Sequence, residues 1–389
     1  MTQDPFGPGY AEDPFAAFDR LRAAEPVFWS DRLRRFVLTR HADVAAVLHD
    51  PAAFSSAVIP RVPAADRDRL AGFTDWSARW LFFLDPPEHT VQRVPVTRAL
   101  SPRAVAELTA DIAELARGLL AGLSGPRFDL LGDFAHPLAA RVVADLLCAP
   151  GTQTEEFLRR ARALERADAD ARDPVARRAG LAAMAGATRA LRDGLRAGRL
   201  RAPVPAALGA AWGERDELVG AHSLMLLFAG VETTQNLVVN AVHALLHRPG
   251  AWAGLARDRT AVAGAVEEAA RMVPPVLGVL RRATRDVTLA GRPVPAGAEL
   301  VVMTAAANRD PARFADPGRF DPYRSPNPHL SFGLGPHYCP GAALTRLTAR
   351  AALEALLERF PRLAPAGEPS WRSHDPIVHA PAALPVDGG

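Results

Sequence analysis

Apolar and polar residues follow a helical period over most of this chain. A spacing of about 3.6 residues marks an amphipathic helix, and it is clear in five segments, 101–123, 154–199, 216–247, 260–272 and 341–359. Short runs typical of strands are few and fall at 27–30, 35–39, 287–289 and 300–303. No linker or change of composition divides the chain. The pattern therefore predicts a single domain over residues 1–389 that is mainly α with a small β-sheet component.

The segment 216–247 predicts a long helix with an unusual centre. Residues 224–229 are apolar on every face, which indicates a buried helix. Gly230, Glu232 and Thr233 follow at once, and polar groups in a buried helix are costly unless they are paired or functional. The helix could simply become polar as it leaves the core, but apolar residues resume at Leu237. We therefore favour a local opening of the helix at a functional site.

Composition and charge narrow the classes of function. Hydrophobic residues make up 49% of the chain and charged residues 23%, as in ordinary globular proteins. The net charge is +3, and all 46 basic residues are arginines scattered among the acids, which argues against nucleic-acid binding. No apolar run is long enough to span a membrane, and the N-terminus does not resemble a signal peptide. We expect a cytoplasmic protein with no membrane partner.

The strongest local signal is the stretch 331–341, SFGLGPHYCPG, which precedes an amphipathic helix. Its glycines permit tight turns close to a ligand, and Cys339 stands at a helix N-terminus, where the dipole and free amides favour a thiolate. A buried structural cysteine would not explain the glycines. Zinc is disfavoured because three or four ligands are needed, and His337 is a weak candidate base for a nucleophile. The residues alone leave a nucleophile or a metal ligand open.

The string from Phe332 through Gly333, His337 and Cys339 to Gly341 resembles the haem-ligand signature of the cytochrome P450 superfamily. The resemblance implies that the Cys339 thiolate is the metal ligand, bound to the iron of haem b (iron protoporphyrin IX). It implies that Phe332, Gly333 and His337 also contact the cofactor. The implied fold is a triangular prism with one long central helix over the haem.

The unusual centre of the long helix is similar to the oxygen-activation motif of this family. The resemblance implies that Ala229 and Gly230 lie against the cofactor and that Gly230 leaves room for dioxygen. It implies that Thr233 donates a hydrogen bond during oxygen activation and that Glu232 passes protons from solvent.

Two further matches follow the family order along the chain. Anionic haem propionates require Arg and His donors, and the resemblance implies that His89, Arg93, Arg281 and His337 supply them. Pro95 departs from the pattern, because it falls in the helix expected to carry His89 and Arg93 and should bend it.

Glu268 and Arg271 share one face of a helix at i and i+3 spacing and resemble the ExxR pair of the family. The resemblance adds Arg319 as the third member of this structural triad.

The resemblance implies a cytochrome P450 monooxygenase that activates O2 to oxidise, by hydroxylation, a hydrophobic organic substrate such as a specialised metabolite. An apolar and aromatic set of residues is expected to line the substrate pocket: Ile59, Phe73, Trp76, Trp80, Phe82, Leu226, Val276, Leu277, Val279, Ile377 and Val378. Oxidative cross-coupling of aromatic rings, for example in a peptide, is an alternative that the sequence does not separate from hydroxylation. A haem-binding sensor is a second alternative, against which the intact Glu232–Thr233 pair argues.

Only 50 residues follow Cys339 in this sequence, so we expect no fused reductase. By analogy with the family, we expect electrons derived from NAD(P)H to arrive through a separate ferredoxin and ferredoxin reductase. Arg93, Arg98, Arg103 and Arg346 could line the docking face. We expect a monomer.

Overall fold

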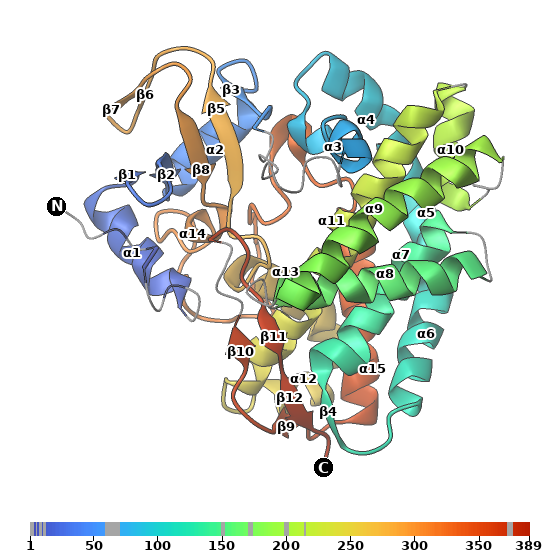
Figure 1. The fold of residues 1–389 in the computed structure, drawn as a ribbon. Helices are drawn as coiled ribbons and strands as arrows, with labels where there is room; N and C mark the ends of the chain where they lie inside the picture. The colour runs from blue at the N-terminus through green and yellow to red at the C-terminus, as the bar shows by residue number, and fades with distance from the viewer. Residues whose placement is uncertain are drawn as a thin grey trace.

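The computed structural model describes residues 4, 6–7, 10, 13–58, 71–148, 152–169, 174–197, 202–213, 215–371 and 376–389. As the hydrophobic period predicts, the protein is mostly helical with small β-sheets. Figure 1 shows the largest sheet and α1 on the side of the N-terminus, and helices α5 to α10 on the opposite side. None of the helices in the described ranges is both long and apolar enough to cross a membrane.

The helices differ widely in length, and most of the long ones lie in the middle of the chain. Their bounds are α1 Pro14–Ala24, α2 His41–His49, α3 Ala71–Ser77, α4 Glu88–Ala99, α5 Pro102–Ala106, α6 Thr109–Ala121, α7 His136–Leu147, α8 Thr152–Ala169, α9 Pro174–Arg196, α10 Pro203–Trp212, α11 Asp216–Leu246, α12 Ala251–Arg257, α13 Val262–Met272, α14 Thr304–Ala307 and α15 Ala342–Arg359. Two of the predicted helical segments each contain two helices, since 101–123 holds α5 and α6, and 154–199 holds most of α8 and α9.

The strands form one sheet of five strands and three smaller ones. The large sheet has the order β1-β2-β8-β5-β3, with bounds Val27–Ser30, Arg35–Leu38, Glu299–Val302, Val279–Ala283 and Phe54–Ser55. β2 and β8 are parallel, with Leu38 opposite Val302, and the other pairs are antiparallel. The smaller sheets are β4 (Arg127–Asp129) with β12 (Pro385–Asp387) and β9 (Ala364–Pro365), β6 (Val287–Leu289) with β7 (Arg292–Val294), and β10 (Ser370–Trp371) with β11 (Pro381–Ala383).

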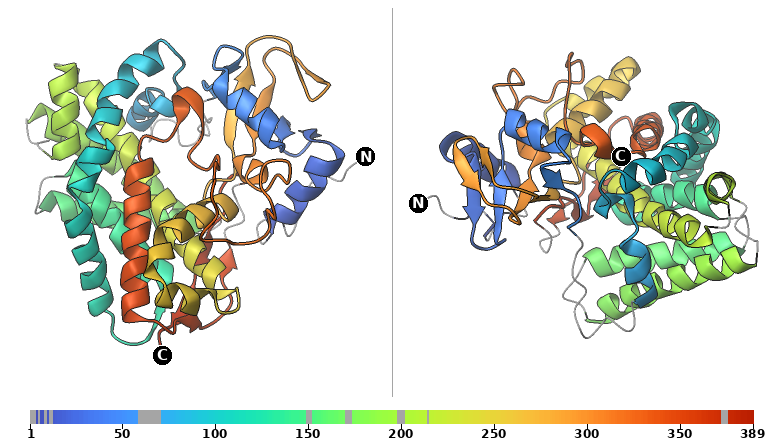
Figure 2. Two further views of the ribbon diagram at one scale, coloured as in Figure 1. Left: turned by 180° about the vertical axis from the view of Figure 1, so that it is seen from behind. Right: turned by 90° about the horizontal axis from the view of Figure 1, so that it is seen from above.

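The long helix α11 organises the helical core. Its 31 residues span about 46 Å at 1.5 Å per residue, and it contacts α3, α7, α9, α10, α13 and α15. Its C-terminal half belongs to a hydrophobic cluster with α6, α7, α13 and α15, while its N-terminal half belongs to a second cluster with α3, α8 and α9. Figure 2 shows α15, the long orange-red helix, from behind and the arrangement from above. A helix surrounded in this way must be apolar on all faces, which explains residues 224–229.

Gly264 of α13 allows the chain at Pro322, which follows the strands of the large sheet, to pack directly against this helix. A Cβ atom built on Gly264 would stand 1.9 Å from the carbonyl oxygen of Pro322, a contact that only a backbone shift could relieve. Gly254 in α12 is the opposite case, because nothing lies within 4 Å of its Cβ position.

We predict opposite effects for alanine at these two helical glycines. Gly264→Ala should destabilise the protein by about 1–3 kcal/mol, the usual cost of overpacking, because the Pro322 backbone must move. Gly254→Ala should be neutral or stabilise by up to about 1 kcal/mol, because alanine has the higher helix propensity. Denaturant midpoints of the two variants test this, and equal midpoints would contradict the close approach at Gly264.

Candidate active site

A loop with two glycines at positive φ places Cys339 at the start of α15. Gly333 and Gly335 have φ angles of +75° and +71°, a region that side chains disfavour. A Cβ on Gly335 would also stand 2.7 Å from the carbonyl oxygen of Leu48 in α2. The Cys339 amide donates to the Phe332 carbonyl at 2.7 Å and closes the loop. The glycines are therefore needed both for backbone angles and for close approach.

The Cys339 thiol is partly buried, and its surroundings shift its pKa in opposite directions. Burial raises the pKa of the thiol, while the amides of Gly341 and Ala342 and the guanidinium groups of Arg93 and Arg346 act to lower it. These amides belong to the first turn of α15, where the helix dipole favours negative charge. A metal ion bound here would supply the remaining stabilisation of the thiolate, because a coordinating thiol is deprotonated outright.

Four side chains able to donate to an anion gather beside this loop. His89 and Arg93 lie on α4, which continues through Pro95, Arg281 lies on β5, and His337 precedes the cysteine. The His89 and His337 rings lie 4.0 Å apart between centroids. Within the described ranges, none of the four bonds to a carboxylate: Arg281 donates to the Leu280 carbonyl at 2.7 Å, Arg93 to the Tyr338 carbonyl, and His337 Nε2 lies 3.0 Å from Ser56 Oγ.

Burial and mutual repulsion suppress positive charge in this cluster. Desolvation, with a contribution from Arg93, lowers the pKa of His89 to about 4, and desolvation, His89 and Arg281 lower that of His337 to about 3. Desolvation lowers the pKa of Arg281 to about 10. Both ring nitrogens of His89 are buried without a hydrogen-bond partner. Unpaired buried donors cost stability, so the cluster is built for an anionic ligand.

The centre of α11 carries the predicted acid and alcohol. Thr233 Oγ1 donates to the Ala229 carbonyl at 2.6 Å, a bond from residue i to i−4 that is open to β-branched threonine in helices. Glu232 is half-buried. A Cβ on Gly230 would lie 2.9 Å from Val143 on α7, so this glycine also lets α7 approach α11, a role that differs from the space for dioxygen expected from the sequence.

Comparisons with known proteins decide the family. A family model described as Cytochrome P450 matches residues 257–382. The chain is 36% identical to the 20-oxo-5-O-mycaminosyltylactone 23-monooxygenase of Streptomyces fradiae, over 93% of this chain and 84% of that relative. The chain belongs to the cytochrome P450 family.

Two further comparisons agree with this P450 assignment. The erythromycin C-12 hydroxylase of Saccharopolyspora erythraea is 34% identical over 98% of this chain and 96% of its own length. The structure of cytochrome P450 CYP109Q5 from Chondromyces apiculatus superimposes with a TM-score of 0.86 at 29% identity, covering 99% of this chain and 97% of that one. The protein is a cytochrome P450 monooxygenase, as the sequence predicts.

The donors of this P450 fit the haem that the family uses. The Cys339 thiol is a soft ligand suited to iron. The unpartnered His89 ring and the Arg93, Arg281 and His337 side chains, none of which binds a carboxylate among the described residues, suit two carboxylates. Phe332 and Gly333 lie on the same loop as the ligand, and Ala229 and Gly230 lie on α11 beside Thr233.

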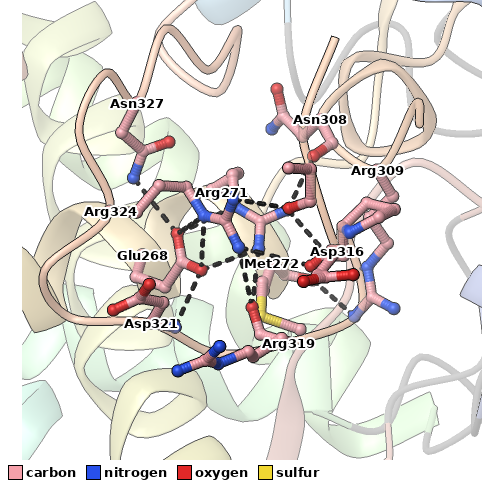
Figure 3. A network of polar contacts seen from close by, with 12 residues as sticks. Glu268, Arg271, Met272, Asn308, Arg309, Asp316, Arg319, Asp321, Arg324 and Asn327 are labelled. Carbon is pink, nitrogen blue, oxygen red and sulfur yellow. Dashed lines mark hydrogen bonds and ion pairs between the residues drawn. The ribbon is translucent and has the colours of Figure 1, made fainter. Parts of the chain in front are cut away.

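The ExxR pair forms a buried ion pair within a larger network, shown in Figure 3. Arg271 donates to Glu268 at 2.7 and 2.8 Å, and both side chains are fully buried. Arg271 also donates to the carbonyl oxygens of Asn308, Pro317 and Arg319. The pair therefore ties α13 to the irregular chain that leads to the cysteine loop.

The third member of the structural triad is Arg324, and the prediction of Arg319 is wrong. The Arg324 Nε donates to both oxygens of Glu268, at 3.0 and 3.2 Å. Arg319 supplies only its backbone carbonyl, and its residue is exposed. Both arginines fall in the same proline-rich stretch, so spacing did not distinguish them.

Glu267, next to the ExxR glutamate, supports the cysteine loop in a way that the sequence did not reveal. It accepts two hydrogen bonds from Arg346 on α15, at 2.6 and 2.9 Å, and lies 3.1 Å from His329 Nε2. The Arg346 guanidinium stacks 4.1 Å from the centre of the Phe332 ring. Arg346 is thus held internally, and the expectation that it lines a docking face is weakened by this pairing.

Two sets of the residues predicted to line the substrate pocket contact one another in the structure. Phe73, Trp80 and Phe82 form an aromatic cluster with Phe83 and with Phe228 of α11. Val276 bridges to Val378, which brings these two predicted pocket residues together. Leu226, Val279 and Ile377 are partly exposed, and Ile59 lies outside the described residues.

Trp76 and Leu277 are core residues, and their prediction as pocket residues is wrong. The Trp76 ring is fully buried against Gly220, where a Cβ atom would stand 2.3 Å from it, and its Nε1 donates to Glu217 of α11. Leu277 is buried in a cluster with Phe15 of α1.

We predict that Arg324→Leu destabilises the protein and Arg319→Leu does not. Loss of charge-assisted hydrogen bonds to the buried Glu268 should cost about 1.5–3 kcal/mol, whereas the exposed Arg319 keeps its carbonyl contacts after substitution. Unfolding of the two holoproteins in denaturant measures the difference. A larger loss in Arg319→Leu would restore the original triad.

Proposed function

We propose that this P450 binds haem b through Cys339 and hydroxylates a hydrophobic specialised metabolite, with electrons from a separate ferredoxin and its NAD(P)H-dependent reductase. The observation that carries the proposal is the position of Cys339 at the start of α15 beside four donor side chains, His89, Arg93, Arg281 and His337, which bind no carboxylate among the described residues. Within this proposal the chain acts as a single domain and a monomer in the cytoplasm, where NAD(P)H is supplied.

The proposed reaction converts RH, O2, two electrons and two protons into ROH and water. Haem iron with a thiolate ligand supplies the chemistry that cleaves the O–O bond. The chain supplies the rest: α11 excludes water along its apolar face, Glu232 exchanges protons with solvent, and the Thr233 hydroxyl holds a proton at Oγ1 that now points to the Ala229 carbonyl. A positioned acid beside a hydroxyl is suited to this proton transfer.

The substrate we propose is a large apolar metabolite of the macrolactone type. The two relatives above are named for oxidation of a mycaminosyltylactone and of erythromycin. The aromatic cluster around Phe228 and the apolar Val276–Val378 bridge provide apolar pocket walls suited to such a substrate.

The face we propose for the ferredoxin lies around α4 and α5. Arg98 and Arg103 are exposed there, and no ion pair holds either of them among the described residues. Both helices are close to the cysteine, since Arg93 of α4 donates to the Tyr338 carbonyl and α5 contacts α15.

The two cysteines provide a matched test of the haem ligand. The ferrous–CO difference spectrum of the purified protein should show the red-shifted Soret band of a thiolate-ligated haem. Cys148→Ser should keep this band, and Cys339→Ser should lose it, because Cys148 lies at the end of α7. Retention of the band in Cys339→Ser, or absence of haem after reconstitution, would refute the proposal.

The two neighbouring threonines provide a second test. Thr233→Ala should raise the peroxide released per NAD(P)H oxidised, because the hydroxyl beside Glu232 is lost. Thr234→Ala should leave this ratio unchanged, because its Oγ1 lies 3.3 Å from Thr345 Oγ1 on α15 and serves packing. The ratio of peroxide to oxidised NAD(P)H is measured with a surrogate ferredoxin and reductase and a panel of macrolactones. Mass spectrometry of the products detects the addition of one oxygen atom. Equal peroxide yields in the two variants would remove Thr233 from the mechanism.

A further inference from the structure

A small cavity lies on the face of α11 that carries Glu232, beneath α8 and α9. Its volume is about 190 Å³, enough for several water molecules. Most of its wall is apolar, and two side chains, Glu232 and Gln235, are the polar exceptions among the described residues that line it: Ala161, Leu164, Met184, Leu227, Phe228, Val231, Glu232 and Gln235.

A hydrogen bond with His136 holds the Gln235 side chain in one orientation. It is 1% exposed, and its Oε1 lies 2.9 Å from Nδ1 of His136, the first residue of α7, which is 2% exposed. With Oε1 at this position, the contact requires the imidazole to carry its proton on Nδ1, because an amide oxygen only accepts. The NH2 group of Gln235 is the part left to donate within the cavity.

The helix places this donor close to the acid. Glu232 and Gln235 are three residues apart, so they are neighbours on one face of α11, and Glu232 directly precedes Thr233. A buried amide without a hydrogen-bond partner is costly. In this otherwise apolar cavity, the partners within reach of the Gln235 NH2 group are the Glu232 carboxylate and water bound to that carboxylate.

We propose that Gln235, oriented by His136, is a positioning residue for proton supply, and that its NH2 group holds the water through which Glu232 is reprotonated. The inference rests on the proposed monooxygenase function, in which each turnover takes up two protons with its two electrons. Gln235 and His136 do not change their own protonation in this scheme. Gln235 orients the water, and His136 orients Gln235.

A purely structural role is the competing account, because the His136–Gln235 hydrogen bond also joins α7 to α11. The two roles separate kinetically. Anaerobic reduction of the protein in the presence of CO needs an electron and no proton supply, whereas aerobic turnover needs both.

The test compares Gln235→Met, which keeps the volume, with Met184→Leu, which alters only the apolar wall of the same cavity. The substrate-free holoprotein with surrogate ferredoxin, reductase and NADPH is assayed for O2 uptake in H2O and in D2O, so no substrate assignment is required. We expect Gln235→Met to lower the aerobic rate severalfold and to raise its solvent isotope effect. Its anaerobic reduction rate and CO spectrum should match those of Met184→Leu and wild type, while its thermal midpoint should fall because the buried hydrogen bond from His136 to Gln235 is lost.

Variants of His136 extend the test. His136→Asn retains a donor for Oε1 and should remain close to wild type, while His136→Phe should resemble Gln235→Met. An unchanged isotope effect in Gln235→Met, or equal losses in anaerobic and aerobic rates, would overturn the proposal and leave a packing role. Failure of the proposed function would appear separately, as loss of the CO spectrum in the wild-type protein.

Discussion

Two arginines and two histidines gather beside a thiol in this protein and bind no carboxylate among the described residues, and the surrounding elements hold them in this arrangement. His89, Arg93, Arg281 and His337 come from a helix, a strand and a loop that are far apart in sequence. Desolvation lowers the pKa of each of these groups, so bringing them together costs stability. An anionic cofactor with two carboxylates, held through its metal by Cys339, would offset that cost.

The loop that presents Cys339 is held by polar contacts that reach back to α13. Glu268 binds Arg271 and Arg324, while the adjacent Glu267 binds Arg346, which stacks on Phe332. Asn308 completes the support, because its side chain binds Ser331 at 2.7 Å and the Leu330 amide at 2.7 Å. Two successive glutamates on one helix therefore fix both the start of the loop and the helix that follows the cysteine.

Much of the fold could be predicted because hydrophobic period depends only on local sequence. The bounds of α11, predicted at 216–247 and found at Asp216–Leu246, illustrate this. Cys339, Glu232 and Thr233 could be assigned expected roles from the sequence because each lies in a contiguous motif, 331–341 for the cysteine and 229–234 for the acid and the alcohol. Trp76 and Leu277 show the limit, since an apolar residue in a loop suits a pocket wall and a core equally well, and only packing against Gly220 or α1 decides. Arg324 was missed because irregular backbone has no period that relates spacing to direction.

We infer that the donors of His89, Arg93, Arg281 and His337 beside Cys339 bind two cofactor carboxylates. The most direct measurement is reconstitution of the apoprotein with haem b and with its dimethyl ester, in which both carboxylates are blocked. The account predicts that the ester binds at least about tenfold more weakly, a loss of about 1.4 kcal/mol, and that Arg281→Leu narrows the difference. Equal affinities for the two haems would contradict it.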